Sequence, residues 1–285
     1  MTVAASAFGL ARGTSALARS CHPAPTVAVT VFVTVLGVTA HNSAGTCAIL
    51  AAAALCGQLS IGWTNDRYDA GRDRAAGRED KPLAQGEIAL RTADAAIVAV
   101  ALVTVALSLA LGWRAGLLHI GAVACGWIYN FWLKSTWWSW LPYAVAFGAL
   151  PGIATLALPT HPGPALWVIA AGALLGVAAN LTNALPDLAG DARTGVSGLP
   201  HRIGPRPSLV LATALLISAT VIVVFGPRGS VPTLAWALFG VVVVAAIAGL
   251  GWAWRRPTSK SAFYGIMASV AVDIVLIALN GKGLH

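Results

Sequence analysis

Long apolar stretches separated by short polar breaks constrain the fold of this chain more than any other feature of its sequence. A helix needs roughly 20 apolar residues to cross about 30 Å of hydrocarbon. Nine stretches of about that length occur, at approximately 24–41, 45–63, 93–112, 115–133, 140–158, 165–185, 208–226, 231–254 and 262–280. Because little sequence remains between them, we predict an all-α, polytopic transmembrane bundle of about nine helices.

The composition disfavours a soluble domain, and the pattern of the apolar stretches disfavours a membrane β-barrel. Hydrophobic residues make up 58% of the 285 residues and charged residues only 10%, and the mean hydropathy is +0.77. A soluble domain carries more than twice that share of charged residues. The apolar stretches are continuous and rich in Ala, Leu, Val and Gly, whereas the strands of a membrane β-barrel alternate between apolar and polar residues.

The basic residues predict an orientation in the membrane. The net charge is +8, but the Lys and Arg residues are distributed over many loops, which disfavours a nucleic-acid partner. If nine spans alternate in direction, 15 of the 18 Lys and Arg residues fall on one face. The positive-inside rule places that face in the cytoplasm. We therefore predict a multi-pass protein, in contact with membrane lipid in the plasma membrane, with its N-terminus and its carboxylate-bearing loops cytoplasmic.

Eight of the ten acidic residues fall in two segments, one after the second apolar stretch and one after the sixth. In the first segment Asn65, Asp69 and Asp73 are spaced four residues apart, with Asp66 beside Asn65. If the preceding helix continues, these side chains lie along one helical face. Like charges at this spacing destabilise a helix unless a cation neutralises them, and oxygen-only ligands suit Mg²⁺. This first ladder therefore predicts a metal site.

A second ladder repeats the device. Asn183, Asp187 and Asp191 have the same spacing at a constant offset of 118 residues, and two Gly pairs and one Pro pair match at that offset. We interpret this as an internal repeat within one domain over 1–285, with helices at about 24–133, a second half at about 140–254 and a ninth helix at about 262–280. The predicted metal ligands are Asn65, Asp66, Asp69, Asp73, Asn183, Asp187 and Asp191.

Basic residues surround both ladders. Arg72, Arg78 and Lys81 follow the first ladder, Arg193 follows the second, and Lys134 ends the fourth apolar stretch. Alternating acids and bases in one plane fit a diphosphate that Mg²⁺ contacts from the carboxylate side and Lys or Arg contacts from the other. We accordingly predict that Arg72, Arg78, Lys81 and Arg193 bind diphosphate.

Together these motifs resemble the UbiA superfamily of intramembrane prenyltransferases, and in particular its 4-hydroxybenzoate polyprenyltransferases. The resemblance rests on the first ladder, Asn65-Asp66-x-x-Asp69-x-x-x-Asp73, then Lys81-Pro82-Leu83 with Gly86, then Asp187-x-x-x-Asp191, and it extends over essentially the whole chain. It implies two four-helix halves, a ninth helix, a lipid-open cavity, and Mg²⁺ that bridges the diphosphate to both ladders. Tyr129 and Lys134 look like the family's Tyr and Lys after the fourth helix.

The resemblance implies a reaction in which Mg²⁺ assists transfer of a prenyl group from a prenyl diphosphate to a small hydrophobic, preferably aromatic, acceptor. The residues expected to be catalytic are Asp69, Asp73, Asp187, Asp191, Lys134 and Tyr129. Two departures from the family pattern stand out: Pro186 precedes Asp187, and Lys81 occupies a position where Arg is common.

Two alternatives stay open at this point. A terpene cyclase of the same superfamily would use the same metal site but quench the carbocation within its own chain. A membrane transporter can also contain internal repeats and membrane carboxylates, but those carboxylates lie near the bilayer midplane. Here both ladders follow the ends of apolar stretches and stand beside arginines, which disfavours a transporter.

Overall fold

The computed structural model describes residues 13–279 and residue 284, and these residues form a helical bundle. The long helices are α2 (Pro23–Thr39), α3 (Ala44–Ala75), α4 (Leu90–Ala110), α5 (Trp113–Phe131), α6 (Leu141–Leu156), α7 (Leu166–Asn183), α10 (Pro205–Phe225), α11 (Thr233–Trp254) and α12 (Ser261–Leu279). Short elements join them on one side: η1 (Leu133–Ser135), η2 (Trp137–Trp140), η3 (Leu185–Asp187), α8 (Leu188–Arg193) and α9 (Leu199–Ile203).

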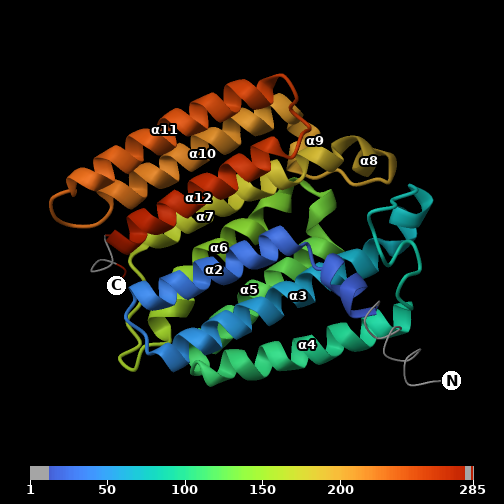
Figure 1. The fold of residues 1–285 in the computed structure, drawn as a ribbon, viewed down its shortest axis with the longest axis horizontal. Coiled ribbons are helices and arrows are strands. Elements are labelled where there is room, and N and C mark those ends of the chain that lie inside the picture. Colours follow the sequence, from blue (N-terminus) through green and yellow to red (C-terminus); the bar gives the residue numbers. More distant parts are fainter. Residues whose placement is uncertain (1–12, 280–283, 285) are drawn as a thin grey trace.

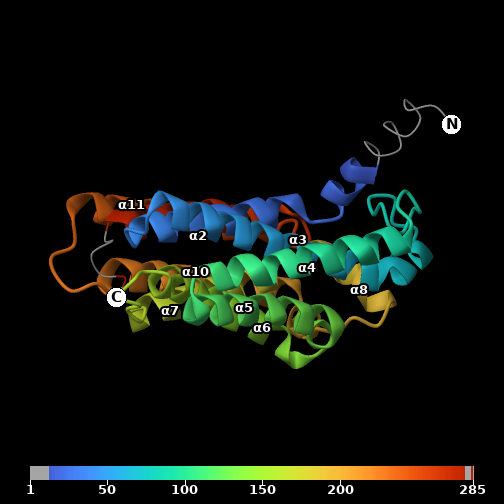
Figure 2. The ribbon, with the colours of Figure 1, turned by 90° about the horizontal axis from the view of Figure 1, so that it is seen from below.

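The long helices form a ring. Consecutive helices contact one another along the chain, and α12 contacts both α7 and α2, which closes the ring between the end of the bundle and its beginning. Figure 1 shows α4 and α11 on opposite outer edges, with α12 between α10 and α2. In the perpendicular view, α2 and α3 lie in one layer, and α5, α6 and α7 lie in the other (Figure 2).

Each predicted apolar stretch overlaps one of these long helices, so the predicted all-α polytopic bundle is confirmed. Within residues 13–279, seven helical segments have the length and hydropathy of a membrane span, and eight do if the short helix Gly13–Arg19 and α2, bent by 72°, count as one. The sequence predicts about nine. Helix α5 falls short because Arg114, His119 and Asn130 lower its hydropathy. The side of the membrane that each loop occupies stays a prediction, and residues 1–12 lie outside the described part.

The first ladder lies on a continuous helix, as its spacing predicts. Helix α3 has 32 residues and runs through Asn65 and Asp73 to Ala75. At 1.5 Å per residue it is about 48 Å long, which exceeds the hydrocarbon thickness of about 30 Å. The end of α3 that bears the carboxylates therefore extends beyond the apolar region if its beginning lies inside it.

The second ladder differs from this expectation. Helix α7 ends at Asn183, and the chain continues as the 3₁₀ turn η3 and the short helix α8. The reason is Pro186, which lacks a backbone N–H and disfavours helical geometry at the residue before it. Asn183, Asp187 and Asp191 therefore do not share one continuous helical face, although their spacing equals that of the first ladder.

The turns that follow the two ladders have the same backbone geometry. Gly77 has φ of 67° and Gly195 has φ of 82°. The N–H of Arg78 donates to the carbonyl of Asp73 at 3.0 Å, and the N–H of Val196 donates to that of Asp191, also at 3.0 Å. Each turn is a glycine C-cap, in which a left-handed Gly ends the helix. Matching caps 118 residues apart support the proposed internal repeat.

A close backbone approach fixes the start of α2 against α3. A Cβ atom added at Gly62 would lie 2.7 Å from the carbonyl oxygen of Cys21, a distance too short for any side chain. We expect Gly62→Ala to push the Cys21–His22 segment away and to lower the free energy of unfolding by about 1–3 kcal/mol. Thermal unfolding of the purified protein measures this. Gly121→Ala, with no atom within 4 Å of its added Cβ, is the matched control and should unfold like the wild type; equal melting of both variants would contradict the argument.

Candidate active site

The ring of helices encloses a cavity of about 310 Å³ whose lining comes chiefly from α2, α3, α5, α6, α7 and α12. Ten of the thirteen residues predicted for the site line it: Asn65, Asp69, Asp73, Arg78, Lys81, Tyr129, Lys134, Asn183, Asp187 and Asp191. The other three, Asp66, Arg72 and Arg193, lie outside the lining. The structure therefore brings both ladders to the same space although 118 residues separate them.

Asp69 is held by two cations. The Nζ atom of Lys134 donates to both carboxylate oxygens of Asp69 at 2.6 Å, and Arg72 forms a further ion pair with the same carboxylate. Lys134 lies in η1, directly after α5, and is 8% exposed. Burial lowers the pKa of Lys134, while the neighbouring Asp69 opposes that change. This contact joins the end of α5 to the middle of the first ladder.

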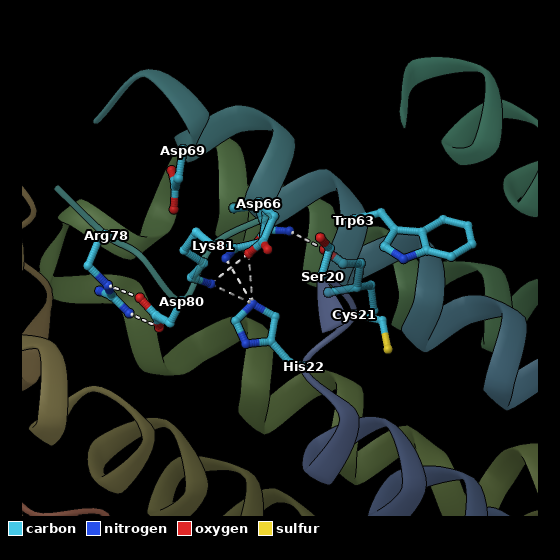
Figure 3. A network of polar contacts seen from close by, with 12 residues as sticks. Ser20, Cys21, His22, Trp63, Asp66, Asp69, Arg78, Asp80 and Lys81 are labelled. Atoms are coloured by element: carbon cyan, nitrogen blue, oxygen red, sulfur yellow. Dashed lines mark hydrogen bonds and ion pairs between the residues drawn. The ribbon is translucent and has the colours of Figure 1, made fainter. Parts of the chain in front are cut away.

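Asp66 is the most deeply buried member of the first ladder, at 2% exposed. Its Oδ1 accepts a hydrogen bond from Lys81 Nζ at 2.7 Å and lies 3.2 Å from Nε2 of His22. Figure 3 shows these three side chains pointing toward one another. The same His22 nitrogen is 3.3 Å from the side-chain nitrogen of Asn65. Asp66 therefore lies behind the cavity and holds two cavity-lining residues in place.

His22 was not among the residues predicted from the motifs. It precedes α2 in the left-handed region, with φ of 53°, which is uncommon for a residue other than Gly. A left-handed backbone conformation at such a residue persists only where surrounding contacts enforce it, and such conformations are frequent at functional sites. Nothing in the spacing of the sequence relates His22 to a ladder that begins 43 residues later.

Arg78 links the two halves of the site. Its guanidinium donates to both oxygens of Asp80, at 2.8 and 2.9 Å, and to Oδ1 of Asp187 at 3.1 Å. The hydrogen bonds with Asp80 raise the pKa of Arg78, and they lower the pKa of Asp80 to about 2. Arg78 is thus a fixed cation at the cavity, between the turn after the first ladder and the start of the second.

Two further residues that line the cavity beside the second ladder, His201 and Tyr143, belong to no motif in the sequence. Nε2 of His201, in α9, lies 3.5 Å from a carboxylate oxygen of Asp191. The Tyr143 hydroxyl accepts a hydrogen bond from Asn183 at 3.4 Å, and its ring lies edge-to-face with Tyr129 at 5.1 Å between centroids. In the repeat, His201 aligns with Leu83, so the internal comparison gives no signal for it.

Away from the carboxylates the cavity becomes an apolar channel. Along α5 its lining follows one helical face from Tyr129 through Gly126 and Val123 to His119. Phe32 and Val33 of α2, Leu150 of α6, Leu175 of α7 and Met267 of α12 line it from other sides. A molecule with a charged end and a hydrocarbon chain matches this division into a polar end and an apolar channel.

The donor set of the polar end is suited to a hard cation. Among the described residues no group of three or more His, Cys, Asp or Glu side chains is arranged to hold a metal ion by itself. The ladder residues that line the cavity nevertheless offer only carboxylate and amide groups, and several are paired with Lys or Arg. Mg²⁺ is commonly bound by one or two carboxylates together with phosphate oxygens of a substrate rather than by an all-protein cage. The residues fit that mode of binding.

Comparison with known families and curated proteins gives two matches. Residues 25–270 match the model of the UbiA prenyltransferase family. The 33 kDa chain of a bacteriochlorophyll synthase from Cereibacter sphaeroides is 28% identical over an alignment of 189 positions, and the match covers 62% of this chain. That match spans 60% of the length of the relative, less than two thirds of it. The narrower resemblance to 4-hydroxybenzoate polyprenyltransferases stays a prediction.

Solved structures share the fold over most of their length. A UbiA homologue from Archaeoglobus fulgidus, solved with DMAPP and Mg²⁺, has a TM-score of 0.69 and 17% identity, and the match covers 92% of this chain and 99% of that one. A UbiA homologue from Aeropyrum pernix K1, solved without ligand, has a TM-score of 0.70 and 19% identity, covering 89% and 97%. At these identities the likeness concerns the fold alone.

Proposed function

The chain belongs to the UbiA prenyltransferase family, and we propose that it transfers a prenyl group from a prenyl diphosphate to a small apolar acceptor with the help of Mg²⁺. The observation that carries this proposal is the convergence of both ladders and three cations on one cavity that continues as an apolar channel. Archaeoglobus fulgidus homologues solved with DMAPP or GPP together with Mg²⁺ support the choice of donor and metal.

We assign the metal to the ladder residues that line the cavity: Asn65, Asp69, Asp73, Asn183, Asp187 and Asp191. Mg²⁺ held there would neutralise negative charge on the departing diphosphate. Asp66 is buried behind the lining and bonded to Lys81 and His22, so we assign it a positioning role. This revises the expectation that Asp66 is itself a ligand.

The cations are placed to exchange partners. Lys134, Arg78 and Lys81 line the cavity, and each bonds a carboxylate of the site. Asp69 and Asp187 are proposed metal ligands, so Lys134 and Arg78 would be free to donate to diphosphate oxygens when those carboxylates bind the metal, and charge-assisted hydrogen bonds of this kind are strong. Lys81 would reach the diphosphate from its place beside Asp66. Arg72 lies outside the lining and acts through Asp69. Arg193 is exposed, and we assign it no direct contact with the diphosphate.

The channel provides the environment for the reacting carbon. Loss of diphosphate from an allylic carbon leaves a positive charge, which the faces of aromatic rings stabilise. Tyr129 and Tyr143 line the cavity beside the second ladder. Apolar walls exclude the water that would otherwise trap the cation. These points support a catalytic role for Tyr129 and extend it to Tyr143.

The lining of the cavity bears on the identity of the acceptor. An aromatic ring is the first class to test, because aromatic residues such as Tyr143, Phe147 and Phe263 line the cavity. The name of the curated relative refers to bacteriochlorophyll and does not single out a simple aromatic ring. Self-quenching by the prenyl chain, as in a cyclase, is the alternative that the same site supports. Membership of a prenyltransferase family leaves no observation in favour of a transporter.

The decisive experiment measures Mg²⁺-dependent diphosphate release by purified protein from geranyl, farnesyl and geranylgeranyl diphosphates. Each donor is supplied with and without a panel of aromatic acceptors, and the products are analysed by mass. Release that requires an acceptor and yields a prenylated product supports the transferase. Release with a cyclic hydrocarbon and no acceptor identifies a cyclase, and absence of release with every donor would refute the proposal.

Arg78→Gln tests the link between donor binding and the two halves of the site. The variant loses a cavity cation, and a hydrogen bond to a charged group contributes about 1.5–3 kcal/mol. We expect the KM for the prenyl diphosphate to rise about tenfold to a hundredfold. Arg67→Gln is the matched control, because Arg67 pairs with Asp94 on the exposed side of α3. An unchanged KM in Arg78→Gln would remove Arg78 from the donor site.

A further inference from the structure

Two polar side chains interrupt the apolar channel far from the ladders. Gln58 of α3 and His119 of α5 both line the cavity, among neighbours such as Val33, Ala54 and Ala122. At 1.5 Å of rise per residue, His119 lies about 15 Å along α5 from Tyr129, and Gln58 lies about 17 Å along α3 from Asp69. We call Gln58 and His119 the polar pair. A channel built only to hold hydrocarbon has no use for either side chain.

The hydrogen bonds around His119 define the state of its ring. The Ser108 hydroxyl donates its one hydrogen to the carbonyl of Thr104, and its oxygen lies 2.7 Å from Nδ1 of His119. Nδ1 must therefore carry the proton of this contact. No carboxylate of the described residues forms an ion pair with His119, so the ring is neutral in this apolar setting. Nε2 is then a hydrogen-bond acceptor with no partner in the described part of the chain.

A glycine in α3 leaves space for the imidazole ring of His119. Nε2 of His119 lies beside Gly57, where an added Cβ would be 3.4 Å away and would also lie 2.8 Å from a methyl group of Val123. Gly57 therefore allows α3 and α5 to approach with the imidazole between them. The amide of the adjacent Gln58 likewise has no hydrogen-bond partner among the described residues, and it faces the cavity. The polar pair thus presents both a donor and an acceptor to whatever fills the channel.

We propose that the polar pair ends the hydrocarbon-binding part of the channel and restricts the enzyme to short prenyl diphosphates. This inference rests on the proposed function. A hydrocarbon tail that reached the pair would displace water and leave the Gln58 amide and His119 Nε2 without partners, which is costly. With C–C bonds of about 1.5 Å, an extended isoprene unit of four chain bonds spans about 5 Å. After the diphosphate, about 15 Å of channel accommodates two to three units.

The test compares kcat/KM for diphosphate release from geranyl and geranylgeranyl diphosphates, using the full-length protein with Mg²⁺. The wild type should favour the geranyl donor by at least about fivefold, the factor that corresponds to the low end of the penalty for an unpaired buried polar group. Gln58→Leu and His119→Leu should each raise the ratio of geranylgeranyl to geranyl activity by about the same factor. His119→Gln keeps a polar side chain and should retain the preference of the wild type.

A matched control makes the same kind of change elsewhere. Thr213 lines a second cavity, of about 230 Å³, between α10, α11 and α12, so Thr213→Val should leave the ratio unchanged. A wild type that prefers the geranylgeranyl donor, or a ratio that neither Leu variant moves, overturns the role of the polar pair. If the wild type releases diphosphate from no donor, the proposed function fails. The relative affinities of the same two donors, measured by quenching of tryptophan fluorescence, then still decide whether the pair selects chain length.

Discussion

Replacing Asp69 with Asn should slow diphosphate release by about 10³-fold or more, because it removes a charged ligand of the Mg²⁺ that would neutralise the departing diphosphate. Asp69 occupies the middle of the first ladder, lines the cavity and accepts two hydrogen bonds from Lys134 at 2.6 Å. Its carboxylate therefore serves both as a proposed metal ligand and as the anchor of a buried cation. Asn keeps the shape of the side chain and an oxygen within reach of Lys134, so the variant should still fold, although the loss of the negative charge that Lys134 and Arg72 share lowers its free energy of unfolding.

The measurement is single-turnover release of diphosphate at saturating Mg²⁺, with size-exclusion chromatography to confirm that the variant is folded. Glu79→Gln is the matched control, because Glu79 is exposed on the turn after the same ladder and lies outside the cavity lining. It should retain nearly full activity. Activity in Asp69→Asn within about tenfold of the wild type would argue against the metal site.

The sequence predicts the fold well because the bilayer permits few alternatives. A continuous apolar stretch of about 20 residues can satisfy its backbone in hydrocarbon only as a helix, so each stretch becomes one. The number of spans is harder to predict where a helix carries polar side chains that face the interior of the bundle. Helix α5 illustrates this: His119 and Asn130 are buried within the bundle, and they lower the very hydropathy by which a span is recognised.

The sequence predicts the site residues that share one helix. It does not predict the residues that come together only when distant segments fold against one another. Regular spacing along α3 is enough to place Asn65, Asp69 and Asp73 on one face. Pro186 interrupts the helix that carries the second ladder. The spacing of Asn183, Asp187 and Asp191 equals that of the first ladder and so gives no sign of this interruption. His22, the strained residue before α2, contacts Asp66. His201, in the short helix α9 after the second ladder, lies beside Asp191. Such contacts depend on the closure of the whole ring.

Asp69 is a proposed metal ligand, whereas Asp66 has a positioning role behind the cavity. We therefore predict that Asp66→Asn will mainly destabilise the protein. The side chains of Asp66 and Lys81 are 2% and 14% exposed, and their charged atoms are 2.7 Å apart. Removing one partner of a buried ion pair typically costs about 3–5 kcal/mol, because the remaining charge is left without compensation. Asp66→Asn should therefore lower the free energy of unfolding by about that amount, measured by denaturation in mixed detergent micelles.

A double variant separates this structural role from the chemistry. In Asp66→Asn combined with Lys81→Met no buried charge is left unpaired, so most of the lost stability should return. Activity should stay low, because Lys81 lines the cavity and would no longer offer a cation to the diphosphate. Asp94→Asn is the control: its pair with Arg67 is exposed, with side chains 49% and 36% accessible, and exposed pairs contribute at most about 1 kcal/mol. If Asp66→Asn unfolds like the wild type yet is inactive, Asp66 belongs with the metal ligands after all.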